Sequence, residues 1–144
     1  MAVFSRKPKP HRLISLDELE PMLKSGKPVL LDFFQVGCAP CQVMDGIMNE
    51  LAREYADTAH IVKVDVTKVA GAAEAFNVRS TPTFVLLGAA PAKQSKKARQ
   101  RAQRDGGPAA PTGKITSRWR TIGLVKKNAL QRLLESNGAS QIGG

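Results

Sequence analysis

The chain has 144 residues, of which 42% are hydrophobic and 24% are charged, and its formal net charge is +10. This length suits one domain with a substantial core, and two cysteines are too few for a disulfide-stapled secreted scaffold. We recognise no signal peptide and no run of transmembrane length, so we expect a soluble, cytoplasmic protein. In that compartment a cysteine pair more often alternates between dithiol and disulfide, or binds metal, than stabilises the fold as a permanent disulfide.

The positive charge is concentrated in three segments: an N-terminal arm (residues 1–12), an internal segment (88–118) and the C-terminal segment (119–144). Residues 1–12 carry four basic side chains and no acid, and residues 88–118 carry eight against a single aspartate. Residues 119–144 carry four against one glutamate, whereas residues 13–87 hold six basic and ten acidic side chains. The chain can therefore have two functions, one that belongs to the acidic residues 13–87 and one that belongs to the basic segments.

After the basic arm, the sequence predicts a helix and then a buried strand. Ser15 and Glu18 have the spacing of a capping box, in which side chains satisfy free amides at a helix start, and Gly26 ends this helix. Residues 29–34 form an apolar run typical of a strand covered on both faces. Asp32 interrupts the run, and a carboxylate is rarely buried unless something uses or satisfies it.

The middle of the chain predicts a helix, a strand, a short helix and another strand. Helical periodicity covers about residues 39–55, with Gly46 as a weak point inside. The residues expected to pack on the sheet are Val43, Ile47, Leu51 and Tyr55. Residues 61–66 alternate as a strand, residues 69–76 are alanine-rich, and residues 83–87 form a third strand. Strand, helix, strand implies a right-handed parallel crossover, and hence an α/β sheet with helices on its faces.

This pattern fails at residues 88–113, which contain no large aliphatic or aromatic residue. Such a composition cannot bury enough apolar surface to offset the entropy of ordering, so we expect a disordered basic insertion. Residues 114–124 predict the last strand, which pairs back with residues 83–87. Residues 128–137 predict the last helix, which Gly138 ends.

The expected organisation is therefore one domain with flexible ends. Its parts are an arm over residues 1–12, a domain over 13–137 that contains the 88–113 insertion, and a tail over 138–144.

Cys38 and Cys41 bracket Ala39 and Pro40 at the start of the second helix. Unpaired amides and the macrodipole at a helix N-terminus lower a thiol pKa, so Cys38 is expected to be the exposed nucleophile. Cys41 lies one turn further in, where it can attack the mixed disulfide that Cys38 forms. Pro40 suits the first turn because it lacks an amide hydrogen that would be unsatisfied anyway.

Half of a zinc site and a purely structural pair are the other interpretations of these cysteines. Zinc usually takes four Cys or His ligands, and the chain adds only His11 and His60, so we expect no metal. Neither interpretation explains Asp32. Lys63, facing inward from a neighbouring strand, is its natural partner, and an ordinary buried ion pair is the alternative to a catalytic one.

Taken together, these motifs resemble the thioredoxin family. The residues that carry the resemblance are Asp32-Phe33-Phe34, Cys38-Ala39-Pro40-Cys41, Lys63-Val64-Asp65-Val66, Arg79-Ser80-Thr81-Pro82-Thr83-Phe84 and Gly123. It covers roughly residues 12–87 and 115–137. It implies a thioredoxin-like α/β fold, with a central mixed sheet flanked by helices and the basic loop inserted before the last strand.

The resemblance also implies a function and partners. The chain would be a monomeric thiol–disulfide oxidoreductase that reduces disulfides of client proteins through a Cys38/Cys41 cycle. It would hold no cofactor beyond its redox-active disulfide, and a thioredoxin-reductase-type partner would recharge it. Asp32, with Lys63 beside it, would help move the proton of Cys41 during exchange.

By the same resemblance, Pro82 would be a cis-proline opposite the cysteines that exposes the Thr81 backbone to an extended substrate. The residues implied to contact substrate are Gly37, Ala39, Pro40, Thr81, Pro82, Ile122 and Gly123. Three positions depart from the family pattern. Gly37 replaces a tryptophan, Ala39 a glycine and Gly46 a helix-kinking proline.

The basic insertion supports a second hypothesis, a thioredoxin-like module that the loop and arm attach to nucleic acid or another polyanion. The cations that would contact phosphates are Lys93, Lys96, Lys97, Arg99, Arg101 and Arg104. No aromatic residue lies among them for base stacking, so sequence-specific recognition is not expected. The plainer alternative is a solvated loop.

Overall fold

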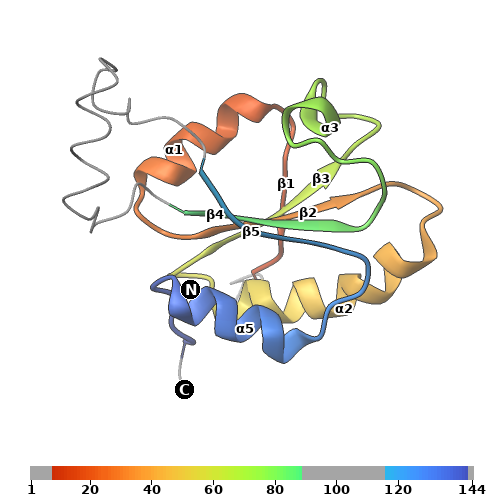
Figure 1. Cartoon of the computed structure of the whole chain (residues 1–144). Helices are drawn as coiled ribbons and strands as arrows, with labels where there is room; N and C mark the ends of the chain where they lie inside the picture. Colours follow the sequence, from red (N-terminus) through yellow and green to blue (C-terminus); the bar gives the residue numbers. More distant parts are fainter. Residues whose placement is uncertain (1–7, 89–115, 143–144) are drawn as a thin grey trace, which may run out of the picture.

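The computed structural model describes residues 8–88 and 116–142 of the chain, which form a sheet with helices on both faces (Figure 1). Its strands are β1 (His11–Arg12), β2 (Val29–Phe34), β3 (His60–Asp65), β4 (Thr83–Gly88) and β5 (Thr116–Ile122). Their spatial order is β1-β3-β2-β4-β5. β3 runs parallel to β1 and β2, whereas β4 is antiparallel to both β2 and β5. The mixed sheet predicted from the sequence is therefore confirmed.

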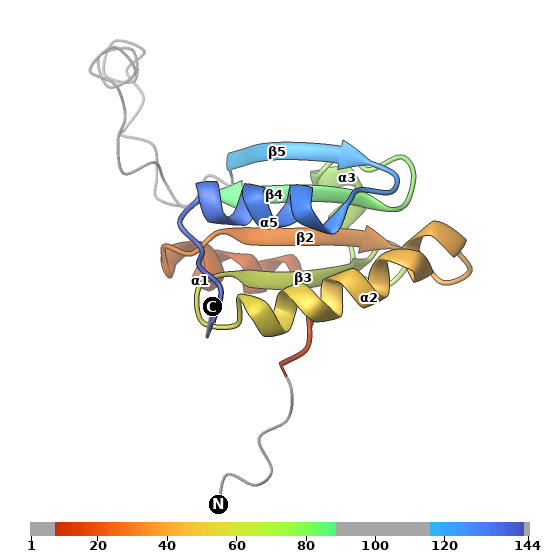
Figure 2. The same ribbon diagram turned by 90° about the horizontal axis from the view of Figure 1, so that it is seen from below.

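The helices cover the two faces of this sheet unequally (Figure 1, Figure 2). They are the 3₁₀ turn η2 (Leu16–Glu18), α1 (Leu19–Lys24), α2 (Ala39–Glu54), α3 (Ala72–Ala75) and α5 (Lys127–Ser136). The long helices α2 and α5 lie on one face, and the short helices α1 and α3 lie on the other. None of the helices in the described ranges has the length and apolar character needed to cross a bilayer.

Alternation along the strands divides the core into two clusters, one on each face of the sheet. Leu30 of β2 packs with α2 and α5, whereas Leu31 and Phe33 pack on the side of α1 and α3. Because side chains alternate along a strand, Asp32 shares the face of Leu30. On the neighbouring strand β3, Lys63 shares the face of Ile61 for the same reason. The carboxylate and the lysine therefore both lie on the face that α2 covers.

The buried stripe of α2 matches the expected one in part. Leu51 and Tyr55 are buried and Ile47 packs against the core, as predicted, whereas Val43 is 63% exposed. The stripe also contains Cys41, Met44 and Met48, which the prediction did not include. The prediction started the stripe at Val43, whereas the buried side of the helix starts at Cys41. A residue two positions after Cys41 lies about 200° around the helix and faces water.

The N-terminal arm contributes two residues to the sheet. His11 and Arg12 pair with Val62 and Lys63 of β3, and the Leu13 amide donates to the Lys63 carbonyl at 2.9 Å. The domain therefore begins slightly earlier than residue 13, the predicted boundary.

The predicted C-terminal tail also packs on the domain over residues 139–142. Ala139 is buried, and Thr58 and Ser140 exchange two hydrogen bonds, from the Thr58 hydroxyl at 2.7 Å and from the Ser140 amide at 3.0 Å. The Ile142 amide donates to the Glu54 carbonyl at 2.7 Å. This part of the tail is thus tied to the C-terminal end of α2, where the sequence predicted a frayed segment.

Candidate active site

The cysteine pair lies where β2 ends and α2 begins. Cys38 is the N-cap residue of α2, and Pro40 occupies the first turn. The two cysteines form a disulfide, with their Cα atoms 5.2 Å apart. The Cys41 amide donates to Cys38 Sγ at 3.2 Å, so the sulfur occupies the position that a capping oxygen takes in other helices. Gly37 enters this cap with a φ of +88°, a left-handed conformation that suits glycine.

The two sulfurs differ in their access to solvent. Cys38 is partly exposed, whereas Cys41 is only 3% exposed and begins the buried stripe of α2. A reactant that arrives from solution can therefore reach Cys38 and not Cys41. Donors at the helix start also stabilise a thiolate at Cys38 more than at an interior position.

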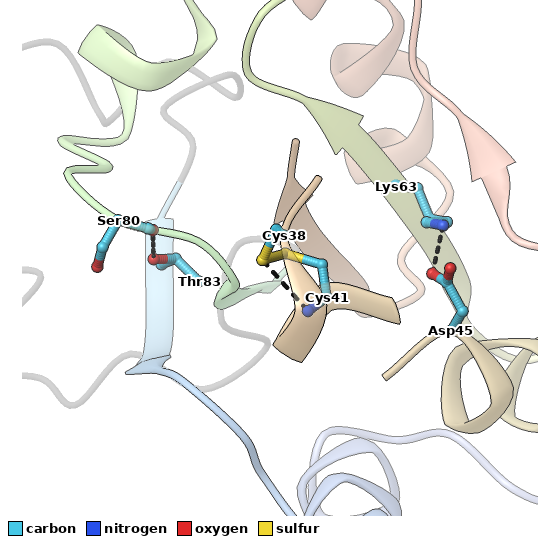
Figure 3. Close-up of a disulfide and its surroundings, with 6 residues drawn as sticks. All are labelled: Cys38, Cys41, Asp45, Lys63, Ser80 and Thr83. Carbon is cyan, nitrogen blue, oxygen red and sulfur yellow. Dashed lines mark hydrogen bonds and ion pairs between the residues drawn. A yellow bond between two sulfur atoms is a disulfide. The ribbon is translucent and has the colours of Figure 1, made fainter. Parts of the chain in front are cut away.

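The turn before β4 lies beside the disulfide (Figure 3). The Thr81–Pro82 peptide bond is cis, as the family resemblance implies. The Thr83 hydroxyl donates to the Ser80 carbonyl at 2.7 Å, which closes this turn. Within the described residues, no hydrogen bond reaches the Thr81 backbone, so its amide and carbonyl are available to an extended peptide.

The end of β5 adds a second edge to this surface. The Gly123 amide donates to the Pro82 carbonyl at 2.9 Å, which fixes the two loops together. Ile122 is 59% exposed beside it. The predicted substrate-contacting residues at positions 81, 82, 122 and 123 are therefore brought together.

Arg120 is a residue that the sequence did not single out. Its guanidinium donates to the carbonyls of Phe76 and Asn77, the latter at 2.6 Å, and thereby ties β5 to the segment that leads into the turn. The sequence could not predict this contact, because the two carbonyls lie more than forty positions away from Arg120.

Asp32 is fully buried, and neither of its carboxylate oxygens has a hydrogen-bond partner among the described residues. Burial raises the pKa of Asp32 to about 7, the nearby Lys63 ammonium opposes this increase, and the Asp45 carboxylate adds to it. A carboxyl with a pKa in this range can accept and release a proton near neutral pH.

The predicted pairing of Lys63 with Asp32 is wrong. The Lys63 ammonium instead binds Asp45 of α2, with Nζ 2.5 Å from Oδ1 (Figure 3). It also lies 4.5 Å from the centroid of the Phe34 ring. The long side chain of Lys63 reaches the half-exposed Asp45, where both charges keep part of their hydration, which costs less than pairing in the interior. The sequence offered no clear signal for Asp45, which lies one turn after Cys41.

The remaining predicted groups lie elsewhere. His11 binds Glu18 at 2.8 Å and His60 binds Ser25 at 3.0 Å. In the described part of the chain, no three His, Cys, Asp or Glu side chains are arranged to hold a metal ion. The basic residues between positions 93 and 104 lie outside the described residues, so polyanion binding stays a prediction.

Comparisons with known proteins place this geometry in context. The family model described as Thioredoxin matches residues 14–105. Thioredoxin Y, chloroplastic, of Oryza sativa subsp. japonica is 38% identical over 73 residues, which are 51% of this chain and 42% of that protein. Thioredoxin-1 of Drosophila melanogaster is 43% identical over 61 residues, 42% of this chain and 57% of that protein. The chain thus spans about half the length of these curated relatives.

A solved structure extends the likeness to most of the chain. A mutant thioredoxin from Halobacterium salinarum NRC-1 superposes with a TM-score of 0.64 at 26% identity, over 92% of this chain and 95% of that one. With the family model matching well over half of its residues, the chain belongs to the thioredoxin family.

Proposed function

We propose that this chain is a thiol–disulfide oxidoreductase that reduces disulfides in partner proteins. The observation that carries the proposal is the Cys38–Cys41 disulfide at the start of α2, with one accessible and one buried sulfur. A pair built only for stability gains nothing from this asymmetry, whereas an exchange cycle requires an entry sulfur and a resolving sulfur.

In the proposed cycle, the Cys38 thiolate attacks one sulfur of a client disulfide. A Cys38–client bond forms, and the other client sulfur leaves as a thiolate that takes up a proton. The Cys41 thiolate then attacks Cys38 Sγ, so the intramolecular disulfide forms and the second client sulfur leaves. Two electrons pass to the client, and the chain ends oxidised.

Asp32 is the proposed proton acceptor for Cys41. Cys41 belongs to the buried side of α2, and Asp32 is buried on the face of the sheet that α2 covers, so bulk water has little access to the Cys41 proton. With the pKa of Asp32 raised by burial to about 7, the carboxylate can accept that proton and later return it.

The client is proposed to lie across the Thr81 backbone and the exposed side chains around Cys38. Ile122 belongs to this surface, and Val36, which precedes Gly37 and is 79% exposed, is an addition that the sequence did not indicate. An extended client strand can bond the Thr81 amide and carbonyl, while the apolar side chains bury against it.

Regeneration requires two electrons and two protons from a reductase, proposed here to be of the thioredoxin-reductase type. A cytoplasmic location and a monomeric state remain part of the proposal. The support for the location is a chain that holds only two cysteines, and the support for the monomeric state is the family resemblance.

Insulin reduction by dithiothreitol, followed as turbidity, tests the proposed activity. The parent should accelerate precipitation, and Cys38→Ser should lower the rate to that of dithiothreitol alone. Cys41→Ser, reduced and then freed of dithiothreitol, should accumulate a mixed disulfide with the client that renewed addition of dithiothreitol releases. Circular dichroism checks that both variants remain folded. A Cys38→Ser variant as active as the parent would exclude the proposed cycle.

A further inference from the structure

Lys63 and Asp32 are neighbours in the sheet that do not bind each other. They are register partners on the parallel strands β2 and β3, and both lie on the face covered by α2. A lysine in this position has the length to reach the carboxylate beside it. Yet both Asp32 oxygens lack a hydrogen-bond partner among the described residues.

Asp45 accounts for this arrangement. Asp45 lies at the edge of the buried stripe of α2, and its Oδ1 is 2.5 Å from Lys63 Nζ. The side chain of Asp45 is 45% exposed, whereas that of Lys63 is 10% exposed. The Phe34 ring lies under the same ammonium, with its centroid 4.5 Å from Nζ. An anion and an aromatic face thus hold the charged end of Lys63 toward the protein surface.

We propose that Asp45 is a positioning residue for the exchange chemistry, because it binds the Lys63 ammonium and thereby keeps it from pairing with the buried Asp32 carboxyl. This inference rests on the proposed function, in which Asp32 exchanges a proton with Cys41. If Lys63 bound Asp32 directly, the carboxylate would be held in its charged form and would be a weak proton acceptor. Asp45 therefore keeps Asp32 available for proton exchange.

The charged groups that act on Asp32 come from two of the elements packed around it. Lys63 of β3 favours the carboxylate, and Asp45 of α2 disfavours it. The residue of β4 in register with Asp32 is Phe84, and its side chain carries no charge. Because Asp45 is half exposed, water screens its direct repulsion of Asp32, so its larger effect passes through Lys63.

The test is a carboxyl ¹³C NMR titration of Asp32 in the full oxidised chain, in which neither cysteine titrates. Asp45→Asn removes the partner of Lys63 and should lower the midpoint of the Asp32 titration by about one pH unit, as Lys63 turns toward Asp32. Asp45→Glu keeps a carboxylate for Lys63 and should restore the parent midpoint. Asp32→Asn assigns the resonance.

Glu50→Gln is the matched control. Glu50 lies on the same helix with a side chain 46% exposed, and it binds Lys127 at 3.3 Å rather than Lys63. This variant removes an equal charge from α2 and should leave the Asp32 midpoint unchanged. A Glu50→Gln shift as large as that of Asp45→Asn would indicate a general effect of charge and overturn the proposal.

The Lys63→Met background identifies the route. There, Asp45→Asn should lower the midpoint much less than in the parent, because no ammonium remains to turn toward Asp32. An equal decrease with and without Lys63, or no decrease in the parent background, overturns the positioning role. Should Lys63→Met fail to fold, the comparison of Asp45→Asn with Glu50→Gln and Asp45→Glu still decides.

The two proposals fail separately. The titration needs neither client nor reductase, so it can succeed even if Cys38→Ser proves as active as the parent. Conversely, an unchanged midpoint in Asp45→Asn removes the role of Asp45 and leaves the Cys38/Cys41 cycle intact. When both hold, Asp45→Asn should also move the acid limb of the pH–rate profile for client reduction to lower pH.

Discussion

Asp32 is a carboxyl that the fold buries without a hydrogen-bond partner among the described residues. Transfer of a charged carboxylate into the interior is costly, so the group holds its proton to higher pH instead. The burial raises its pKa from 3.8 to about 7. The native chain therefore binds a proton between about pH 4 and pH 7 that the unfolded chain has already released.

This difference sets the sign of a pH dependence in stability. The contribution of Asp32 is fully present below about pH 4 and is lost as the pH rises through about 7. A change of about three pKa units corresponds to about 4 kcal/mol. Asp32→Asn should remove this slope and should be more stable than the parent at pH 8 by up to about that amount. Urea unfolding of the oxidised proteins between pH 4 and pH 8 measures the effect.

Asp57→Asn provides the control for this experiment. Asp57 is an exposed acid beyond the end of α2, and its replacement should leave the slope of the parent. If Asp32→Asn keeps the parent slope as well, the buried carboxyl is not the origin of the pH dependence.

The sequence could predict the burial of Asp32 but not its relation to Lys63. An acid inside an apolar strand is visible in one dimension, because the run itself implies a covered strand. The choice of Lys63 between two acids depends on how far its side chain extends and on how exposed each partner is. Neither quantity is encoded in local spacing, so Asp45 was missed.

Among the elements, α2 contains a position at which the native residue is not optimal. Gly46 lies inside this helix, is exposed, and has no atom within 4 Å of where a Cβ would lie. Gly46→Ala should therefore raise the free energy of unfolding by about 0.5–1 kcal/mol, because alanine has less backbone entropy to lose. Urea unfolding monitored by circular dichroism at 222 nm measures the gain.

Gly123→Ala should give the opposite result. Gly123 also has open space around a Cβ, but its φ of +90° is strained for any other residue, at about 1–2 kcal/mol. The pair separates backbone conformation from packing, since neither site has a steric obstacle. Equal effects at both sites would contradict the assignment to conformation.

Element boundaries followed closely from periodicity where an apolar run was continuous. The strand predicted over residues 29–34 matches β2, and the one predicted over 61–66 is displaced by one residue from β3. The helix predicted over 69–76 contracts to Ala72–Ala75, because alanine-rich composition does not mark its ends. The same spacing predicted Leu51 and Tyr55, which are buried, and Val43, which is exposed, so the error lies near the start of the helix.

At the scale of the whole molecule, the C-terminal residues join the ends of α5 and α2. Removing residues 139–144 deletes the buried Ala139, the two hydrogen bonds between Thr58 and Ser140, and the bond that the Ile142 amide donates to the Glu54 carbonyl. At about 0.5–1.5 kcal/mol for each net hydrogen bond, the truncation should cost about 2 kcal/mol or more. Urea unfolding measures the loss, and the rate of insulin reduction should stay unchanged because the cysteines are distant in the fold.

Removal of residues 143 and 144 alone is the matched control, since it keeps every contact described for the tail. It should leave the unfolding midpoint at the parent value. If the longer truncation also leaves the midpoint unchanged, the contacts at residues 139–142 contribute nothing to stability. The sequence did not predict this anchoring, because small and polar residues after Gly138 carry no periodic signal.

The order of the strands has a consequence for the behaviour of the protein at high concentration. β1 has only two residues, so β5 is the longer of the two edges. Arg118 and Arg120 are exposed along β5. A second copy that added its own β5 in antiparallel fashion would bring like charges face to face across the new pair of strands, which is unfavourable. The arginines of β5 therefore disfavour pairing of this edge with a second copy, which is a route to aggregation.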